Sequence, residues 1–129
     1  KSQRFDKWCT DVGTGVVCKA PHTLKWERFV AQPTHKNGVY IRGGKDNKWC
    51  RDTSDGIKCD QAHPVTQDDS GLFRMVKKGN SNALIGGREG RYCAVEDNRV
   101  ICNRRGIGSY ETLQLTAPPE LKSNKKRML

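Results

Sequence analysis

The chain has 129 residues, a length that suits a single compact domain. Its formal charge of +10 favours acidic partners, such as anionic glycans, nucleic acid, acidic lipid or an acidic protein surface. No apolar run approaches the roughly 20 residues of a membrane-spanning helix, so no membrane span is predicted. The sequence starts at Lys1 without a visible signal peptide, as expected of a processed product or an excised segment.

One sequence pattern occurs three times along the chain. In each copy an aromatic residue precedes a cysteine, eight residues follow, and a second cysteine closes the unit. The aromatic residues are Trp8, Trp49 and Tyr92, which are 41 and 43 residues apart. This period predicts one domain built from three repeats, with approximate bounds 1–36, 37–79 and 80–117, followed by a basic tail at 118–129.

All six cysteines belong to the repeat. Zinc sites usually contain cysteines two to four residues apart, with a second pair or histidines, and that spacing is absent here. The sequence therefore predicts no metal site but three disulfides, one within each repeat, and an oxidising, extracellular location. Six reduced core cysteines in a cytoplasmic protein are the alternative. The predicted pairs are Cys9–Cys18, Cys50–Cys59 and Cys93–Cys102.

Each cysteine pair is expected to lie on a β-hairpin. In the first copy a strand over 8–12 is followed by a turn at 13–15 and a return strand over 16–18. Turn residues at 53–56 and 96–98 predict the same hairpin in the other two copies.

Further strands are predicted on both sides of the hairpins. Strands follow them at 24–30, 71–76 and 109–115, and strands precede the second and third hairpins at 39–42 and 83–85. The pairs Gly43-Gly44 and Gly86-Gly87 mark places where the chain bends sharply or approaches another backbone. The first copy lacks its opening strand, which leaves about eleven strands. Either a segment upstream in a longer precursor or the tail after Thr116 would fill the gap.

The predicted fold class is all-β. Turn residues recur every 8–12 positions and no segment has a convincing helical period. Four strands in a repeat, three repeats and a tight hairpin in each predict a β-trefoil, a six-stranded barrel capped by three hairpins. A three-bladed propeller has the same strand count, but propellers with so few blades are unusual.

The repeat resembles the fascin-like β-trefoil repeat. The shared pattern is Leu/Ile-x-Gly-Gly-x-x-Gly/Asn-Lys/Arg-aromatic-Cys, then a turn, Val/Ile-x-Cys and x-aromatic-Glu-x-Phe/Leu. The third copy, from Ala83 through Cys102 to Leu113, is the nearest. The resemblance covers nearly the whole chain and implies a β-trefoil. It does not imply a ligand, because β-trefoils bind actin, sugars, growth-factor receptors and heparin-like glycans.

The sequence offers little catalytic chemistry. His22 and His63 each lie four residues after the second cysteine of their repeats, but three-fold symmetry separates them, so they are read as loop residues. Nucleophile, phosphate-loop and zinc-protease motifs are absent, which predicts a non-enzymatic protein without a cofactor. Carboxylates in the hairpins are expected to bond backbone N–H groups, or alternatively sugar hydroxyls: Asp11, Asp52, Asp55, Glu96 and Asp97.

Aromatic and basic residues supply the candidate binding site. The repeated Trp8, Trp49 and Tyr92 are expected to form a layer in the barrel, with ligand stacking as the alternative. Trp26 and Tyr110 are the surface candidates. Repeated basic positions beside the hairpins predict a three-fold basic face for sulfates or phosphates: Lys45 with Arg88, and Lys7 with Lys48 and Arg91. The tail cluster Lys125, Lys126 and Arg127 is a further polyanion contact or a solvated end.

These features predict a secreted, disulfide-linked module that recognises carbohydrate, specifically an anionic glycan. One alternative is a cytoplasmic, actin-binding or structural component resembling a single fascin unit, with a protein partner and reduced cysteines. A nucleic-acid-associated basic subunit and one module of a larger toxin or adhesin are further alternatives.

Overall fold

The computed structural model describes residue 2 and residues 7–34, 37–78, 81–106, 112–113 and 127–128. Its strands are β1 (Trp8–Asp11), β2 (Val16–Ala20), β3 (Val30–Pro33), β4 (Val39–Arg42), β5 (Trp49–Thr53), β6 (Gly56–Gln61), β7 (Phe73–Lys78), β8 (Ser81–Gly86), β9 (Arg91–Glu96), β10 (Arg99–Arg104), β11 (Thr112–Leu113) and β12 (Arg127–Met128). Two short 3-10 helices are η1 (Lys25–Glu27) and η2 (Asp69–Gly71). No helix among the described residues is long and apolar enough to span a bilayer.

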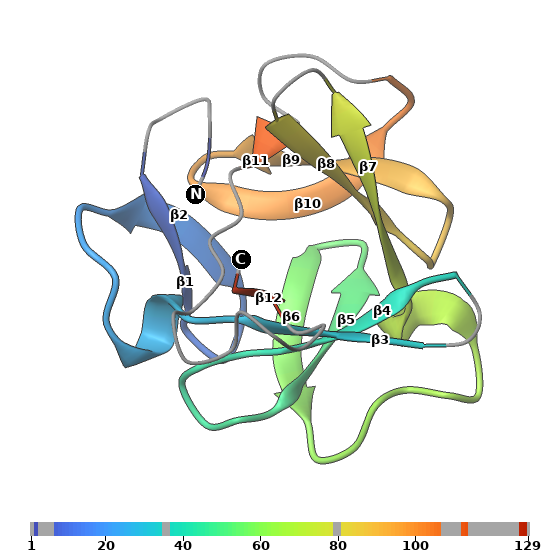
Figure 1. Ribbon diagram of the computed structural model, residues 1–129, viewed down its shortest axis with the longest axis horizontal. Coiled ribbons are helices and arrows are strands. Elements are labelled where there is room, and N and C mark those ends of the chain that lie inside the picture. The colour runs from blue at the N-terminus through green and yellow to red at the C-terminus, as the bar shows by residue number, and fades with distance from the viewer. Residues whose placement is uncertain are drawn as a thin grey trace.

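The strands form the predicted β-trefoil. Antiparallel pairing runs in the order β12-β3-β4-β7-β8-β11, and these strands curl into a barrel (Figure 1). The hairpins β1–β2, β5–β6 and β9–β10, one from each repeat, cap it. Two of the hairpins also join directly, through the pairing of Val17 in β2 with Arg99 in β10.

The strand missing from the first repeat is replaced by the C-terminal tail. Within the described residues, eleven strands belong to the three repeats, in agreement with the prediction, and β12 is the twelfth. It lies antiparallel to β3, with Arg127 opposite Ala31. In the second repeat the opening strand β4 is likewise antiparallel to β7, with Val39 opposite Phe73. Of the two explanations for the gap, the tail is the one that the topology supports. The remainder of the basic tail lies outside the described residues.

Three disulfides hold the hairpins, as the spacing predicted. The bonded pairs are Cys9–Cys18, Cys50–Cys59 and Cys93–Cys102. Partners lie directly opposite each other in the strand ladders, and all six belong to the hydrophobic core. The barrel strands and the residues before them contribute the largest core side chains, which include Phe29, Ile41, Phe73 and Leu84. Three disulfides indicate an oxidising environment.

The hairpin turns also follow the sequence. Gly13 and Gly56 have φ of 85° and 124°, values at which a side chain would be strained. Asp97 and Asn98 both have positive φ, 48° and 67°, as a two-residue hairpin turn that follows the strand twist requires.

The strand predicted over 24–30 is wrong except at its last residue, Val30. Helix η1 occupies Lys25–Glu27, and β3 begins only at Val30. The cause is the carboxylate of Glu27, which accepts hydrogen bonds from the Leu24 backbone N–H at 2.8 Å and from Thr10 Oγ1 at 2.8 Å. These contacts fold the segment into a turn instead of an extended strand. The strand predicted over 71–76 is confirmed from Phe73 onward, after η2. Of the strand predicted over 109–115, the structure describes Thr112–Leu113.

The interpretation of the repeated aromatic residues as a barrel layer is also wrong. Trp8, Trp49 and Tyr92 are half-buried and lie outside the hydrophobic core cluster. Each directly precedes a buried cysteine, and successive side chains on a strand point to opposite faces. Trp49 instead packs edge-on against Tyr40, with ring centroids 6.3 Å apart, and carries the Arg42 guanidinium over its face at 5.7 Å.

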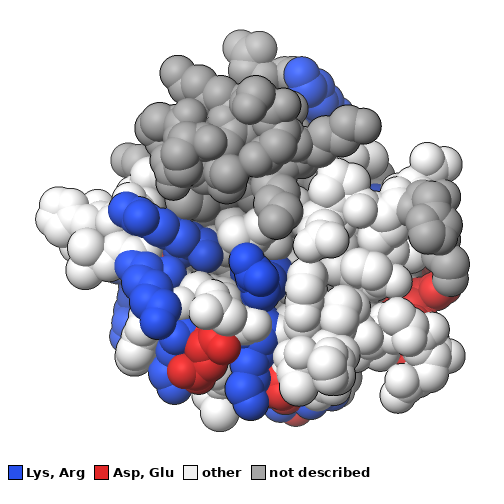
Figure 2. Space-filling model, turned by 60° about the horizontal axis from the view of Figure 1, so that its bottom comes forward, with Lys and Arg blue, Asp and Glu red and all other residues white. Residues whose placement is uncertain are grey.

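The positive charge is unevenly distributed over the face seen in Figure 2. Lys and Arg side chains gather on one side of the face seen in Figure 2, with few Asp or Glu side chains among them. The charge of +10 therefore includes a local concentration of basic groups on this face.

Candidate functional site

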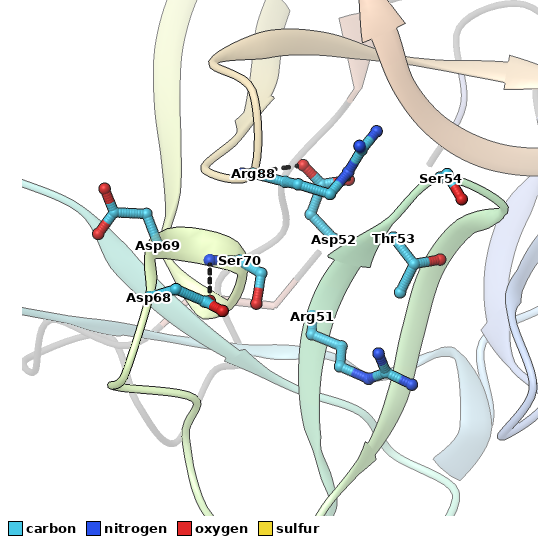
Figure 3. A pocket seen from close by; sticks show the side chains of 8 residues that line it. All are labelled: Arg51, Asp52, Thr53, Ser54, Asp68, Asp69, Ser70 and Arg88. Atoms are coloured by element: carbon cyan, nitrogen blue, oxygen red, sulfur yellow. Dashed lines mark hydrogen bonds and ion pairs between the residues drawn. The ribbon is translucent and has the colours of Figure 1, made fainter.

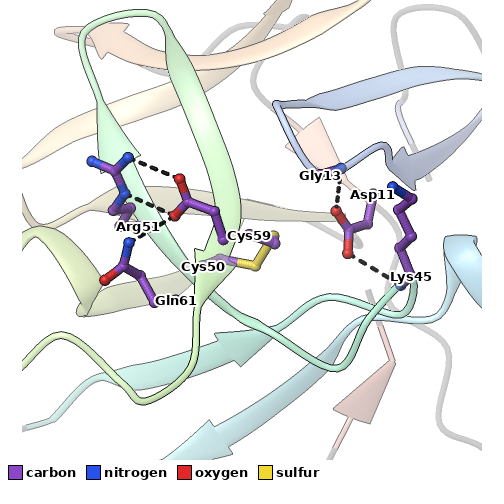
Figure 4. The surroundings of a disulfide bond; sticks show 8 residues. Asp11, Gly13, Lys45, Cys50, Arg51, Cys59 and Gln61 are labelled. Carbon is purple, nitrogen blue, oxygen red and sulfur yellow. Dashed lines mark hydrogen bonds and ion pairs between the residues drawn. A yellow bond between two sulfur atoms is a disulfide. The ribbon is translucent and has the colours of Figure 1, made fainter.

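Buried aspartates join the first two hairpins to the loop of the following repeat. Asp52 in β5 accepts a hydrogen bond from the backbone N–H of Arg88 at 3.2 Å through Oδ2 (Figure 3). Asp11 in β1 accepts from the backbone N–H of Lys45 at 3.1 Å through Oδ2 and from that of Gly13 at 2.9 Å through Oδ1 (Figure 4). Both side chains are buried. The carboxylates of Asp11 and Asp52 bond backbone N–H groups, as predicted, and the bonds from Lys45 and Arg88 cross between repeats.

Glycines make room for these carboxylates. A Cβ at Gly43 would lie 2.1 Å from Asp11 Oδ2, and one at Gly86 would lie 2.3 Å from Asp52 Oδ2. The corresponding contact, between the third repeat and the first, lacks both the aspartate and the glycine. Val95 stands two residues after the first cysteine of the third repeat, where the other copies have Asp, and Ser2 occupies the position of the glycine. The Ser2 backbone N–H donates to the Lys7 carbonyl at 2.8 Å, just as that of Gly43 donates to Lys48 at 2.8 Å.

Burial affects the titration of both aspartates. Desolvation raises the pKa of Asp11 and of Asp52 above 3.8, and the backbone hydrogen bonds offset part of that rise. A carboxyl group whose folded pKa is raised binds its proton more tightly in the folded state. Its contribution to stability is therefore complete below pH 3.8 and is lost as the pH rises through the folded pKa.

Asp60 is affected in the opposite direction. Arg51 donates to it from Nε and Nη2, both at 2.9 Å, and holds the pKa of Asp60 at about 2. Its stabilisation is therefore complete above the unfolded value of 3.8 and is lost as the pH falls towards about 2.

We expect Asp60→Asn to flatten the dependence of the unfolding free energy on pH between about 4 and 2. In the wild type the unfolded state binds a proton at residue 60 in this range while the folded state does not, and the asparagine removes this difference. Urea unfolding at a series of pH values measures this slope. Asp69→Asn is the control, since Asp69 is exposed and forms no ion pair in the described part of the chain. Equal slopes for Asp60→Asn and the wild type would contradict the assignment.

The predicted basic residues lie at more than one junction between repeats, and the three-fold basic face stays a prediction. Lys45 and Arg88 occupy equivalent positions at two different junctions between repeats. The Arg88 side chain is engaged by Glu89 at 2.7 Å and by Asp52 at 3.7 Å. Arg91 lies in β9, paired with Gly86. Tyr110, Lys125 and Lys126 lie outside the described residues, and of Arg127 only the backbone pairing in β12 is described.

A hollow lined by two lysines and two aspartates lies at the junction of the first two repeats, and we name it the basic hollow after its lysines. It has a volume of about 280 Å³ and is lined by Gly13, Thr14, Asp46, Lys48, Lys58, Cys59 and Asp60. Within the described residues, neither Lys48 nor Lys58 forms an ion pair. Lys58 was missed by sequence reasoning, although its position one residue before Cys59 on a strand marks it as facing outward.

Lys45 connects this hollow to an exposed tryptophan. Its Nζ lies 5.3 Å from the ring centroid of Trp26, which is 43 % exposed. The same Nζ lies 3.5 Å from where a Cβ on Gly13, a lining residue of the hollow, would be, and Figure 4 shows the side chain alongside Asp11 and Gly13. Trp26, Lys45, Lys48 and Lys58 therefore line one continuous region, here named the basic junction surface.

The histidines take no part in this surface. His22 and His63 are exposed in loops and are not among the residues that line the basic hollow. Among the described residues, no group of three His, Cys, Asp or Glu side chains is placed to hold a metal ion.

Comparison with known proteins supports the fold. No family model matches the chain, and no curated protein matches it either. The chain is similar to the crystal structure of ThreeFoil, a designed protein with three-fold symmetry, with a TM-score of 0.73, 12 % identity and coverage of 86 % of this chain and 91 % of that chain. The fascin-like assignment remains a prediction. Topology and comparison together identify the chain as a β-trefoil protein made of three repeats, each with one internal disulfide.

Proposed function

We propose that this chain is a non-enzymatic, extracellular binding module that recognises an anionic glycan through the basic junction surface. The observation that carries the proposal is the pair of lysines in the basic hollow, Lys48 and Lys58, without an ion-pair partner among the described residues. Ammonium groups that lack a carboxylate partner are available to sulfate or carboxylate groups of a ligand.

The aromatic residue adds a second mode of recognition. The exposed ring of Trp26 offers an apolar face, on which the C–H groups of a pyranose ring can pack. Lys45 beside it supplies a charge within reach of the same ligand. The weak contact of Lys45 with Asp46, at 3.9 Å and partly exposed, contributes little and does not prevent this.

The disulfides support the extracellular part of the proposal. Cytoplasmic proteins rarely keep structural disulfides, whereas secreted domains commonly depend on them. All six cysteines are bonded here, and all six are buried in the core.

Retention on immobilised heparin, compared with a plain cation exchanger, tests the proposal. We expect the wild type to elute from heparin at a distinctly higher salt concentration. The double variant Lys48→Ala with Lys58→Ala should lose most of that difference, because it removes the two lysines that line the hollow. The matched control is Arg74→Ala with Lys77→Ala, which removes the same charge from exposed positions on β7.

Two results would contradict the proposal. Elution of the wild type at the same salt concentration from both columns would show attraction by net charge alone. An equal loss of heparin retention in both double variants would show that the basic junction surface has no special role.

A further inference from the structure

The junction of the second and third repeats contains a different hollow. It has a volume of about 420 Å³ and is lined by Arg51, Asp52, Thr53, Ser54, Asp68, Asp69, Ser70 and Arg88. Figure 3 shows Asp68, Asp69 and Ser70 of the η2 region on one side and Asp52, Thr53 and Ser54 of the hairpin on the other, with Arg88 between them. Every lining residue is polar or charged.

Asp52 leaves one carboxylate oxygen without a hydrogen bond. Its side chain has no exposed surface, and among the described residues Oδ1 has no hydrogen-bond partner. The Arg88 Nε lies 3.7 Å away, which is an ion-pair contact but too long for a hydrogen bond. A buried acceptor left unbonded costs free energy, so the structure favours a ligand group that donates to it.

The equivalent aspartate in the first repeat shows the contrast. Asp11 uses both oxygens, because the Gly13 backbone N–H bonds Oδ1 while that of Lys45 bonds Oδ2. In the second repeat, the described part of the chain supplies only the bond to the following loop, from Arg88. The two junctions therefore share the aspartate and differ in whether its second oxygen is already bonded.

The two junctions also differ in the residue at the middle of the 3-10 helix. In η1 it is Trp26, which lies against the Lys45 side chain. In η2 it is Ser70, whose small side chain lines the hollow. Replacing an indole by a hydroxymethyl group at this position accounts for the space beside Asp52.

The polar groups in the hollow define the ligand. Asp68 and Asp69 disfavour sulfate or carboxylate groups there, and the guanidinium of Arg51 is already bonded to Asp60. The Ser54 and Ser70 hydroxyls can each donate or accept. We propose that this hollow binds an uncharged saccharide residue, and that a sugar hydroxyl donates to Asp52 Oδ1 when the partly exposed Arg88 side chain beside it moves aside. This site is separate from the basic junction surface and does not depend on the function proposed for it.

A titration followed by ¹H–¹⁵N NMR tests the proposal, with the methyl glycosides of galactose, glucose, mannose and N-acetylglucosamine as probes. At least one probe should shift the backbone signals of Ser54, Ser70 and Arg88. Ser70→Trp should abolish those shifts, because it places at η2 the residue that η1 already carries. Ser70→Ala, which keeps the space, should retain binding.

Three outcomes would overturn the proposal. They are the absence of shifts with all four probes, unchanged binding by Ser70→Trp, and shifts at these residues caused by a sulfated heparin oligosaccharide in place of the uncharged sugars. Since the probes carry no charge, failure here leaves the heparin result unaffected, and failure on heparin leaves this site unaffected.

Discussion

Gly44→Ala should lower the free energy of unfolding by about 3 kcal/mol. A Cβ on Gly44 would lie 1.9 Å from the Lys25 carbonyl oxygen and 2.8 Å from that of Arg28. These are backbone atoms of the η1 turn, which cannot swing aside as a long side chain can. The substitution therefore forces the loop before β5 away from η1, and urea unfolding would show a lower midpoint with an unchanged slope.

The equivalent glycine of the third repeat, Gly87, allows a second test of the same idea. A Cβ on Gly87 would lie 2.0 Å from the Asp69 carbonyl oxygen and 2.3 Å from that of Leu72, so Gly87→Ala should cost a similar amount. Gly106→Ala is the control, because a Cβ there meets nothing within 4 Å and its φ is not in the left-handed region. Its effect should stay within about 0.5 kcal/mol. Equal stabilities for the three variants would show that close backbone approach is not what requires the glycine pairs.

Asp11→Ala is expected to cost about 3 kcal/mol, since it removes two hydrogen bonds to a carboxylate and leaves two backbone N–H groups without their partner. One of these groups belongs to Lys45 in the next repeat, so the substitution also weakens the contact between repeats. Thermal or urea unfolding measures the loss.

Asp52→Ala supplies the comparison for this prediction. It removes one such hydrogen bond, that of Arg88, and should therefore cost less than Asp11→Ala. If Asp52→Ala proved as costly as Asp11→Ala, or costlier, the number of backbone groups bonded would not explain the stability.

Local patterns were enough to predict most of the fold. The spacing of Cys50 and Cys59 places the two residues opposite each other once the turn between them closes, so the hairpin and its disulfide followed from one interval. Gly44 and Gly87 were correctly read as places of close backbone approach, whereas Gly43 and Gly86 lie against aspartate side chains. The error over 24–30 arose because alternating apolar and polar residues fit a strand, whereas Glu27 is bonded to Thr10, 17 residues earlier.

The candidate sites depend on contacts that no local pattern contains. Asp52 and Arg88 are 36 residues apart, and their contact emerges only when the repeats pack. Lys45 and Arg88 were correctly aligned as equivalents, but their neighbours Trp26 and Ser70 differ. Symmetry in the sequence therefore predicted equal sites, and the structure shows two hollows of different chemistry.

Mapping a heparin hexasaccharide onto the protein by ¹H–¹⁵N NMR tests the proposed glycan recognition most directly. We expect the backbone signals of Gly13, Lys45, Lys48 and Lys58 to shift together and to return as salt is added, because the contacts are ionic. The indole N–H of Trp26 should shift with them. Shifts confined to the C-terminal tail, or spread evenly over all exposed basic residues, would contradict binding at the basic junction surface.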